Sequence, residues 1–157
     1  METEKQPWIA EFYEKEKVSD DPDDIYEEMK EASDFLCRSF EIHVESLNRE
    51  YGRDTISVIA PPPGFMHAVF DTGAKTPGFL VLFGTSKLIM VLFGNEKAIT
   101  FVGRKIDPDP QKPKKNMKLL GINWEEEKSG GYLFRDSTGV EIEVHELILR
   151  VIRWGTT

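Results

Sequence analysis

The chain has 157 residues, a formal net charge of −8 and one cysteine, and 39% of its residues are hydrophobic. This length fits one domain, because domains most often contain about 100–150 residues, and a chain of this size buries enough surface to fold without cross-links. A single cysteine excludes an internal disulfide and a cysteine-based zinc site. We therefore expect one α+β domain over residues 1–157, located in the cytoplasm and without a metal or cofactor.

The charge is unevenly distributed along the chain. Residues 1–54 carry 17 acidic and 7 basic residues, whereas residues 55–157 carry 11 acidic and 13 basic residues. A strongly acidic surface repels nucleic-acid phosphates and attracts basic partners, so nucleic acid is not an expected ligand. A solvated helix surface that keeps the protein in solution is the simpler interpretation of the same charge.

Two helices are predicted in the acidic region, residues 1–54. The first is short and amphipathic and begins near Pro7. The second begins at Asp21–Asp24, where a capping carboxylate precedes proline and further acids, and ends at Gly52. Its length allows a break near Ser33 or Ser39. Its apolar stripe consists of Ile25, Met29, Ala32, Leu36, Phe40, Val44, Leu47 and Tyr51.

Residues 55–143 have the composition and turn signals of strands, and residues 144–155 form a closing amphipathic helix. Helices followed by a run of strands predict an α+β fold with an antiparallel sheet or meander of about six to eight strands. On element order alone, the alternative is a barrel that resembles pleckstrin-homology-like domains and is capped by the C-terminal helix. Strands are expected at Thr55–Ala60, Phe65–Asp71, Phe79–Phe83, Leu88–Phe93, Ala98–Val102, Met117–Trp124, Gly131–Arg135 and Val140–Glu143.

The segments Phe79–Phe83 and Leu88–Phe93 are apolar at every position. Successive side chains of a strand point to opposite faces, so both faces of these two strands must be covered. We expect either a homodimer or helices on both faces of the sheet. The charges of Lys87, Glu96 and Lys97 argue against a membrane span in this region.

The segment Ala68–Ala74 is an apolar strand that ends in Asp-Thr-Gly-Ala, and Leu119–Trp124 contains an apolar-apolar-Gly pattern. Together these segments resemble the active-site loop and the closing segment of retropepsin-type aspartic proteases. The resemblance implies that Asp71 is a catalytic carboxylate, shared between two subunits, and that Thr72 braces the loop. The preferred interpretation is a strand end followed by a turn.

Several side chains are candidates for ligand or partner binding. A ligand carrier would have a cavity lined by Phe65, Phe79, Phe83 and Trp124, and His67 shares a strand face with Phe65. The segment Arg104–Lys118 carries a net charge of +4, and we expect it to lie against the acidic helices of its own chain or of a dimer mate. Glu141, Glu143 and His145 would share one face of an extended last strand, although a solvated sheet face is the preferred interpretation. The candidate binding residues are Phe65, His67, Phe79, Phe83, Trp124, Arg104 and Lys105.

These observations favour a non-catalytic binding or regulatory module that acts through an acidic helical face or an apolar cleft. An inhibitor or immunity-type protein for a basic partner is one concrete form of this function. The partner is expected to be another protein or a second copy of the chain. The alternatives are an aspartic-protease-like hydrolase that uses Asp71 and a carrier of a small apolar ligand. Cys37 is expected to be a buried, unreactive side chain.

Overall fold

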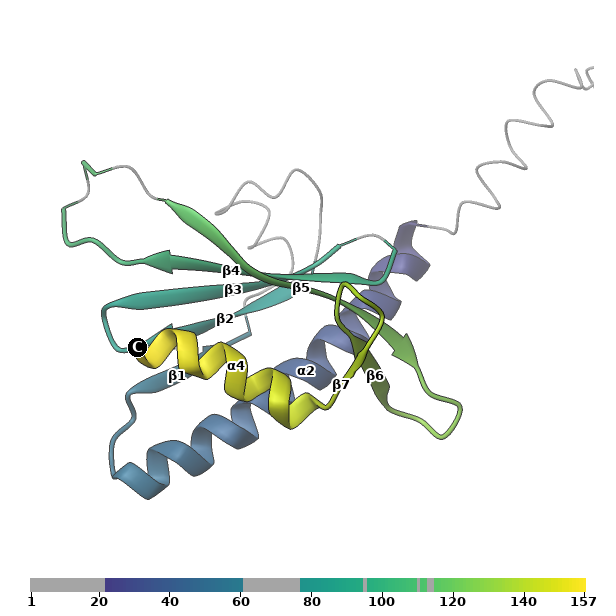
Figure 1. The fold of residues 1–157 in the computed structure, drawn as a ribbon, viewed down its shortest axis with the longest axis horizontal. Coiled ribbons are helices and arrows are strands. Elements are labelled where there is room, and N and C mark those ends of the chain that lie inside the picture. Colours follow the sequence, from purple (N-terminus) through teal and green to yellow (C-terminus); the bar gives the residue numbers. More distant parts are fainter. Residues whose placement is uncertain (1–21, 61–76, 95, 110, 113–114) are drawn as a thin grey trace, which may run out of the picture.

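The computed structural model describes residues 22–60, 77–94, 96–109, 111–112 and 115–157, without the side chains of residues 22–25. Within these residues, two helices and seven strands form an α+β fold (Figure 1). The elements are α2 (Pro22–Tyr51), β1 (Ile56–Ile59), β2 (Gly78–Phe83), β3 (Lys87–Phe93), β4 (Ala98–Lys105), β5 (Asn116–Glu126), β6 (Tyr132–Arg135), β7 (Glu141–Ile142) and α4 (Val144–Thr156).

This order confirms the α+β class, the long helix, the antiparallel sheet and the C-terminal helix. The expected short helix near Pro7 and the expected strand Phe65–Asp71 lie outside the described residues. The predicted strand ends are correct to within about three residues, and the largest difference is at β4, which continues to Lys105.

The 30 residues of α2 form one continuous helix. Its apolar stripe is buried over most of its length, but Tyr51 is 75% exposed, so the stripe is shorter than predicted. The helix is broken at neither Ser33 nor Ser39, and the Ser39 hydroxyl is satisfied within the helix by donating a hydrogen bond to the Phe35 carbonyl oxygen (2.9 Å). Gly52 ends the helix with a φ of +68°, which glycine adopts without a steric penalty.

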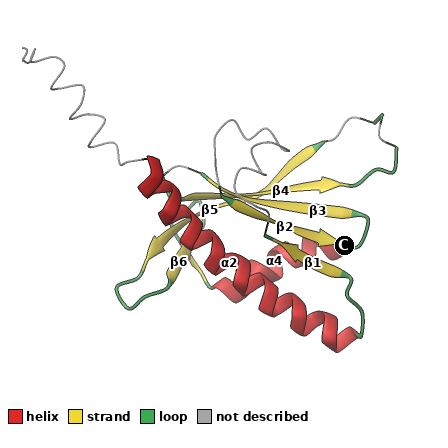
Figure 2. Ribbon diagram, turned by 180° about the vertical axis from the view of Figure 1, so that it is seen from behind, coloured by secondary structure: helices red, strands yellow, loops and turns green. Residues whose placement is uncertain are grey.

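Each strand pairs antiparallel with its neighbour in sequence, so the sheet is a seven-stranded meander in the order β1 to β7. Short turns close the central hairpins, as predicted. Gly84 has a φ of +59° between β2 and β3. In the next turn the Gly94 N–H donates to the Ala98 carbonyl oxygen (2.8 Å). The sheet is strongly curled (Figure 2).

Both helices lie on the same face of the sheet, called here the inner face (Figures 1 and 2). On this face Val81 and Val91 are fully buried among side chains of both helices. On the outer face Leu80 and Met90 form a second apolar cluster and are 7% and 2% exposed. Both faces of β2 and β3 are therefore enclosed, as their uninterrupted apolar sequence predicts.

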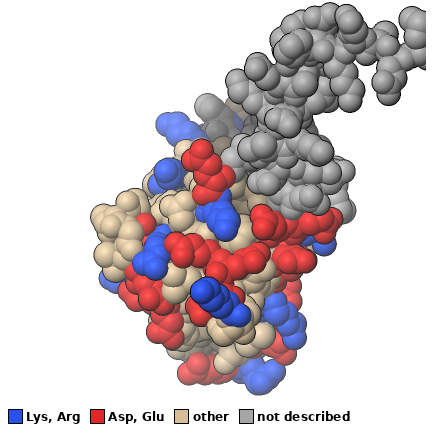
Figure 3. Space-filling view, turned by 90° about the vertical axis from the view of Figure 1, so that its right-hand side faces the viewer, with Lys and Arg blue, Asp and Glu red and all other residues tan. Residues whose placement is uncertain are grey.

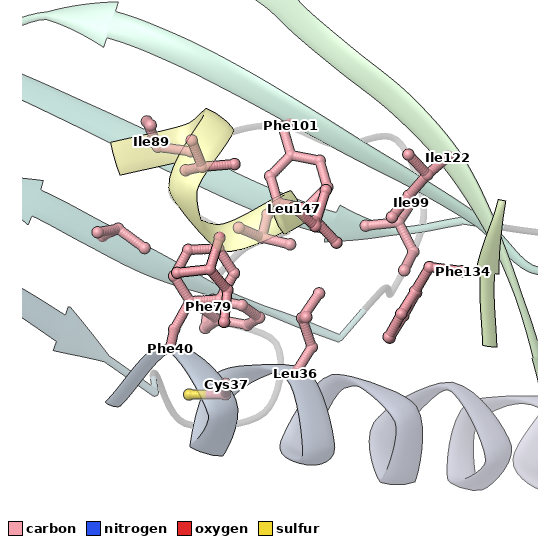
Figure 4. Close-up of a cluster of buried hydrophobic side chains, with 14 of the residues drawn as sticks. Leu36, Cys37, Phe40, Phe79, Ile89, Ile99, Phe101, Ile122, Phe134 and Leu147 are labelled. Carbon is pink, nitrogen blue, oxygen red and sulfur yellow. The ribbon is translucent and has the colours of Figure 1, made fainter. Parts of the chain in front are cut away.

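Aromatic rings dominate the core between α2 and the inner face (Figure 4). The ring of Phe40 on α2 lies 5.5 Å from that of Phe79 on β2 and 6.5 Å from that of Phe101 on β4. Leu147 of α4 enters the same cluster and is fully buried. The core thus joins the first and last described elements through the central strands.

The C-terminal helix α4 approaches the sheet closely at two glycines. A Cβ atom at Gly155 would lie 2.2 Å from the ring of Phe83, and one at Gly103 would lie 2.5 Å from the ring of Trp154. Lys87 on β3 donates to the Trp154 carbonyl oxygen (2.9 Å) at the end of α4. A cation at this position stabilises the negative end of the helix dipole.

The positively charged connection between β4 and β5 lies away from the acidic helix. In both ribbon views its described residues extend beyond the sheet, separated from α2 by the strands (Figures 1 and 2). Lys112 instead pairs with Asp107 inside the same connection, at 3.6 Å. The expectation that this segment packs against the acidic helices of its own chain is therefore wrong for α2, because the long β4–β5 hairpin carries it away; the other expected helix lies outside the described residues.

Candidate functional site

A groove with a volume of about 410 Å³ runs between the C-terminal half of α2 and the edge strand β1. Its α2 residues recur at spacings of one, three and four, which places them on one face of the helix. The floor is apolar, since Val44 is buried and Val58 is partly buried. This α2–β1 groove is lined by Glu41, Val44, Glu45, Asn48, Arg49, Asp54 and Val58.

The rim of the groove carries three carboxylates and one guanidinium. Arg49 pairs with Glu45 at 3.1 Å, and both side chains remain largely exposed. This ion pair neutralises the single cation of the rim, and Arg38 outside the groove pairs with Glu41 at 3.4 Å. Asp54 forms no ion pair with the described residues and leaves the rim with a net negative charge. Ile42, which is 56% exposed, adds an apolar side chain next to Glu45 on the same helix.

Asn48 connects the helix to the edge strand at the groove. Its side-chain N–H donates to the carbonyl oxygen of Ile56 (2.8 Å), and its side-chain oxygen accepts from the Ile56 N–H (3.3 Å). The Asn48 side chain thus satisfies both the N–H and the carbonyl oxygen of Ile56, as the backbone of a neighbouring strand would. This pair of bonds holds β1 against α2 and sets the width of the groove.

The rest of the described surface of α2 is also acidic. Every basic residue of the helix forms an ion pair with an acid one turn away: Lys30 with Asp34, Arg38 with Glu41 and Arg49 with Glu45. Figure 3 shows the end of the molecule where α2 begins, with Asp and Glu side chains in a broad band and separate Lys and Arg side chains between them. The acidic surface of α2 comprises Glu27, Glu28, Glu31, Asp34, Glu41, Glu45 and Glu50.

The negative charge of these acids affects the pKa of Tyr132 on the neighbouring strand β6. The pKa of Tyr132 is raised above its ordinary value, first by burial and then by nearby carboxylates. Three of these carboxylates, those of Glu28, Glu31 and Asp34, lie in the N-terminal half of α2. Tyr132 also lies against Phe35 of α2, with 5.0 Å between ring centroids.

The structure does not bring the predicted binding residues together. Phe79, Phe83 and Trp124 are at most 4% exposed and belong to the inner core, where the helices pack on them. Arg104 and Lys105 lie at the end of β4, and the Arg104 Nε donates to the Asn116 side-chain oxygen (2.8 Å). The remaining predicted binding residues, Phe65 and His67, lie outside the described residues.

The two residues implicated by the protease resemblance, Asp71 and Thr72, also lie outside the described residues. The second segment of that resemblance, Leu119–Trp124, forms part of β5, between β4 and β6. Its Trp124 is 1% exposed, and the indole Nε1 has no hydrogen-bond partner among the groups that the structure describes.

The predicted patch of Glu141, Glu143 and His145 does not form. Strand β7 ends at Ile142, so His145 belongs to the first turn of α4 and not to the strand. His145 instead lies 4.9 Å from His43 of α2, measured between ring centroids. The part of the chain that the structure describes contains no cluster of three or more potential metal ligands.

Cys37 is buried on α2 as predicted. Burial raises the pKa of its thiol to about 12, and the neighbouring Glu41 carboxylate, 3.5 Å from the sulfur, contributes in the same direction. A thiol with this pKa is protonated at neutral pH, so Cys37 is not a nucleophile in the folded protein.

Sequence reasoning missed the groove and the role of Asn48. The signal was available in the residues that follow Glu41 on the helix, because Val44, Glu45 and Asn48 continue one face of it toward Gly52. Asn48 lies on that face one turn before the helix ends at Gly52, so its side chain can form hydrogen bonds with the backbone of the strand that follows.

Comparisons with known proteins add no relative. No protein-family model, no curated protein and no solved structure matches this chain. Neither described helix combines the length and the uncharged apolar sequence that crossing a membrane requires.

Proposed function

We propose that this protein is a non-catalytic binding module that captures a basic protein through the acidic surface of α2 and the adjoining α2–β1 groove. An inhibitor or immunity-type protein in the cytoplasm is the form of this function that we favour. Binding of this kind needs a preformed surface with one dominant sign of charge, and it needs no catalytic group.

The pairing of charges along α2 supports the proposal. Among the described side chains of the helix, each cation is already neutralised by an acid one turn away. Glu27, Glu28, Glu31 and Glu50 form no ion pair with the described residues and remain exposed. These unpaired carboxylates can attract a basic protein over a distance, and binding to them does not require the ion pairs within the helix to break.

The test uses the purified chain on an array of basic proteins and of acidic proteins of equal size. We expect capture of a basic protein that weakens steeply as salt is raised, because screening shortens the range of exposed charges from ~10 Å at about 0.1 M to ~3 Å at about 1 M. Salt-independent capture, or a preference for acidic proteins, would contradict the proposal.

A pair of double variants locates the surface. Glu27→Gln with Glu31→Gln removes two charges from α2 and should weaken capture roughly twofold to thirtyfold, since exposed pairs contribute about 0.2–1 kcal/mol each. Glu141→Gln with Glu143→Gln removes the same charge at the opposite sheet edge and should leave capture unchanged. Equal losses for the two variants would show that net charge alone, and not α2, determines binding.

Two alternative functions remain open as proposals. A carrier of a small apolar ligand is the first of these alternatives. It predicts that a hydrophobic fluorescent probe binds and quenches tryptophan emission. An aspartic-protease-like hydrolase predicts acid-dependent peptide cleavage that Asp71→Asn abolishes.

Two structural proposals accompany the function. The first is a homodimer, which light scattering would detect; the outer face of β2 and β3 is already buried in the single chain and does not require it. The second is that the meander and α4 together correspond to a pleckstrin-homology-like barrel. The order of strands followed by a C-terminal helix supports this second description.

A further inference from the structure

The edge strand β1 presents part of its backbone to the α2–β1 groove. The Gly84 N–H donates to the Thr55 carbonyl oxygen (2.8 Å), so these two residues form a hydrogen-bonded pair at the start of the β1–β2 ladder. Hydrogen-bonded and non-bonded pairs alternate along an antiparallel ladder. Ser57 and Ile59 therefore point their backbone groups toward β2, whereas Ile56 and Val58 point theirs away from it.

Only one of these two outward-pointing residues is bonded within the described chain. The side chain of Asn48 saturates the N–H and the carbonyl oxygen of Ile56. No described residue bonds the N–H or the carbonyl oxygen of Val58, and Val58 lines the groove. The edge is thus closed at Ile56 and open at Val58, where an incoming strand would find one donor and one acceptor.

The groove beside this open edge has the features of a peptide site. Helix α2 forms its wall, Val44 and Val58 form an apolar floor, and its volume of about 410 Å³ lies within the usual range of ligand pockets, roughly 300–1,000 Å³. Extended peptides add to exposed sheet edges through backbone hydrogen bonds, while side-chain pockets beside the edge select the sequence.

Charge decides which strand can occupy the groove. Three carboxylates and one guanidinium line the groove, and Asp54 forms no ion pair with the described residues, so lysine or arginine side chains of an incoming strand are favoured. A second copy of the chain would place its own acidic residues against these carboxylates, which costs free energy. The occupant with complementary charge is therefore a basic segment and not another copy.

We propose that the edge of β1 and the α2–β1 groove bind an extended, basic peptide segment of the partner protein as an additional strand next to Val58. The inference rests on the proposed function, because it names the part of the basic partner that is recognised. Asn48 fixes where the added strand stops, since its amide already occupies the position next to Ile56.

The deciding variant is Val58→Pro. Proline removes the outward N–H of residue 58 but no bond of the β1–β2 ladder, and edge strands tolerate proline at such positions. The matched control is Val58→Ile, which keeps the N–H, the β-branch and the apolar floor of the groove. The probe is an end-blocked octapeptide of alternating lysine and valine, titrated calorimetrically into the full chain at low ionic strength.

We expect the octapeptide to bind Val58→Pro about tenfold or more weakly than Val58→Ile, because one backbone bond is lost and one peptide carbonyl is left unpaired. Hydrogen exchange of the Val58 amide should slow when the peptide is added. Thermal melting of Val58→Pro checks that this variant is folded.

A second measurement uses the natural chain alone and does not depend on the folding of a variant. Two octapeptides are compared, each with N-methyl groups on the amides of one strand edge. Because only one edge of an added strand faces β1, methylation of one edge should abolish binding and methylation of the other should leave it intact. Binding of both methylated peptides would overturn strand addition.

The outcomes separate this inference from the proposed function. If basic proteins are captured through α2 but the octapeptide does not bind, or binds Val58→Pro and both methylated peptides equally well, the inference is wrong and the proposed function stands. A dimer that Val58→Pro dissociates would identify a second copy as the occupant and would also overturn the inference. If no basic protein is captured, the proposed function itself fails.

Discussion

The imidazole rings of His43 on α2 and His145 on α4 face each other across the contact between the two helices, with 4.9 Å between their centroids and 59° between their planes. The pKa of His43 is lowered from its ordinary value near 6.5, first by burial and then by the charge of His145. The first and last described helices therefore meet at a pair of groups that repel each other when both are protonated.

This pair makes the stability of the fold depend on pH. The unfolded chain binds a proton at His43 near pH 6.5, while the folded chain binds it only at lower pH. Acidification through this window therefore favours unfolding. We expect the natural chain to lose the most stability between about pH 7 and pH 5, His145→Gln to lose less and His43→Gln to lose the least.

Urea unfolding at each pH measures the three slopes. His145→Gln removes only the repulsion, whereas His43→Gln also removes the partly buried titrating group, so the graded order is the specific signature. Carboxylates titrate equally in all three chains and cancel in the comparison. Identical slopes would show that the two rings do not interact in solution.

Gly155 allows α4 to lie directly on the ring of Phe83. We expect Gly155→Ala to lower the free energy of unfolding by about 1–3 kcal/mol, as overpacking typically does, although alanine favours helices. Gly94→Ala is the control, because the atom nearest to its added methyl group is the Ala98 carbonyl oxygen at 3.9 Å. Chemical denaturation compares the two, and equal effects would contradict the close approach.

Asn48 should contribute measurably to the attachment of β1. Asn48→Ala removes two hydrogen bonds from the backbone of Ile56, and we expect a loss of roughly 1–3 kcal/mol in thermal or urea unfolding. Asn123→Ala removes one long, exposed bond to the Glu96 carbonyl oxygen (3.4 Å) and should have little effect. If Asn48→Ala is as mild as the control, the amide does not hold the strand.

The thiol of Cys37 should be inert in the folded protein. Because burial and Glu41 raise its pKa to about 12, iodoacetamide at pH 8 should leave it unmodified for as long as the chain is folded. In concentrated urea the same reagent should alkylate it readily. Mass spectrometry of the intact protein distinguishes the two results, and rapid alkylation of the folded chain would contradict the buried position.

The sequence predicted most of the elements, because their signals are local. Asp-Pro at the start and Gly52 at the end define α2, and apolar runs separated by short polar turns define the hairpins of β2, β3 and β4. The enclosure of both sheet faces also followed from local sequence, since β2 and β3 have no polar face that could contact water.

The site could not be predicted in the same way. The α2–β1 groove depends on the path that the chain takes after Gly52, and the bond of Asn48 to Ile56 depends on the distance between a helix and an edge strand. The conditional patch of Glu141, Glu143 and His145 does not form for a local reason, because the helix predicted over residues 144–155 takes His145 out of the strand. Alternation continues from Glu141 to His145 in the sequence, but the chain enters a helix at Val144, and the histidine faces α2 instead.

The nearest-neighbour order of the sheet has a consequence for how the molecule assembles. Every ladder joins strands that follow each other in the chain, so each hairpin closes only a modest loop and the contact order of the sheet is low. The hydrogen bond from Lys87 to Trp154 joins residues that are 67 positions apart, so the contact of α4 with the sheet is more distant in sequence than the strand pairings. Rapid growth of the meander followed by docking of α4 is the folding route that this architecture favours.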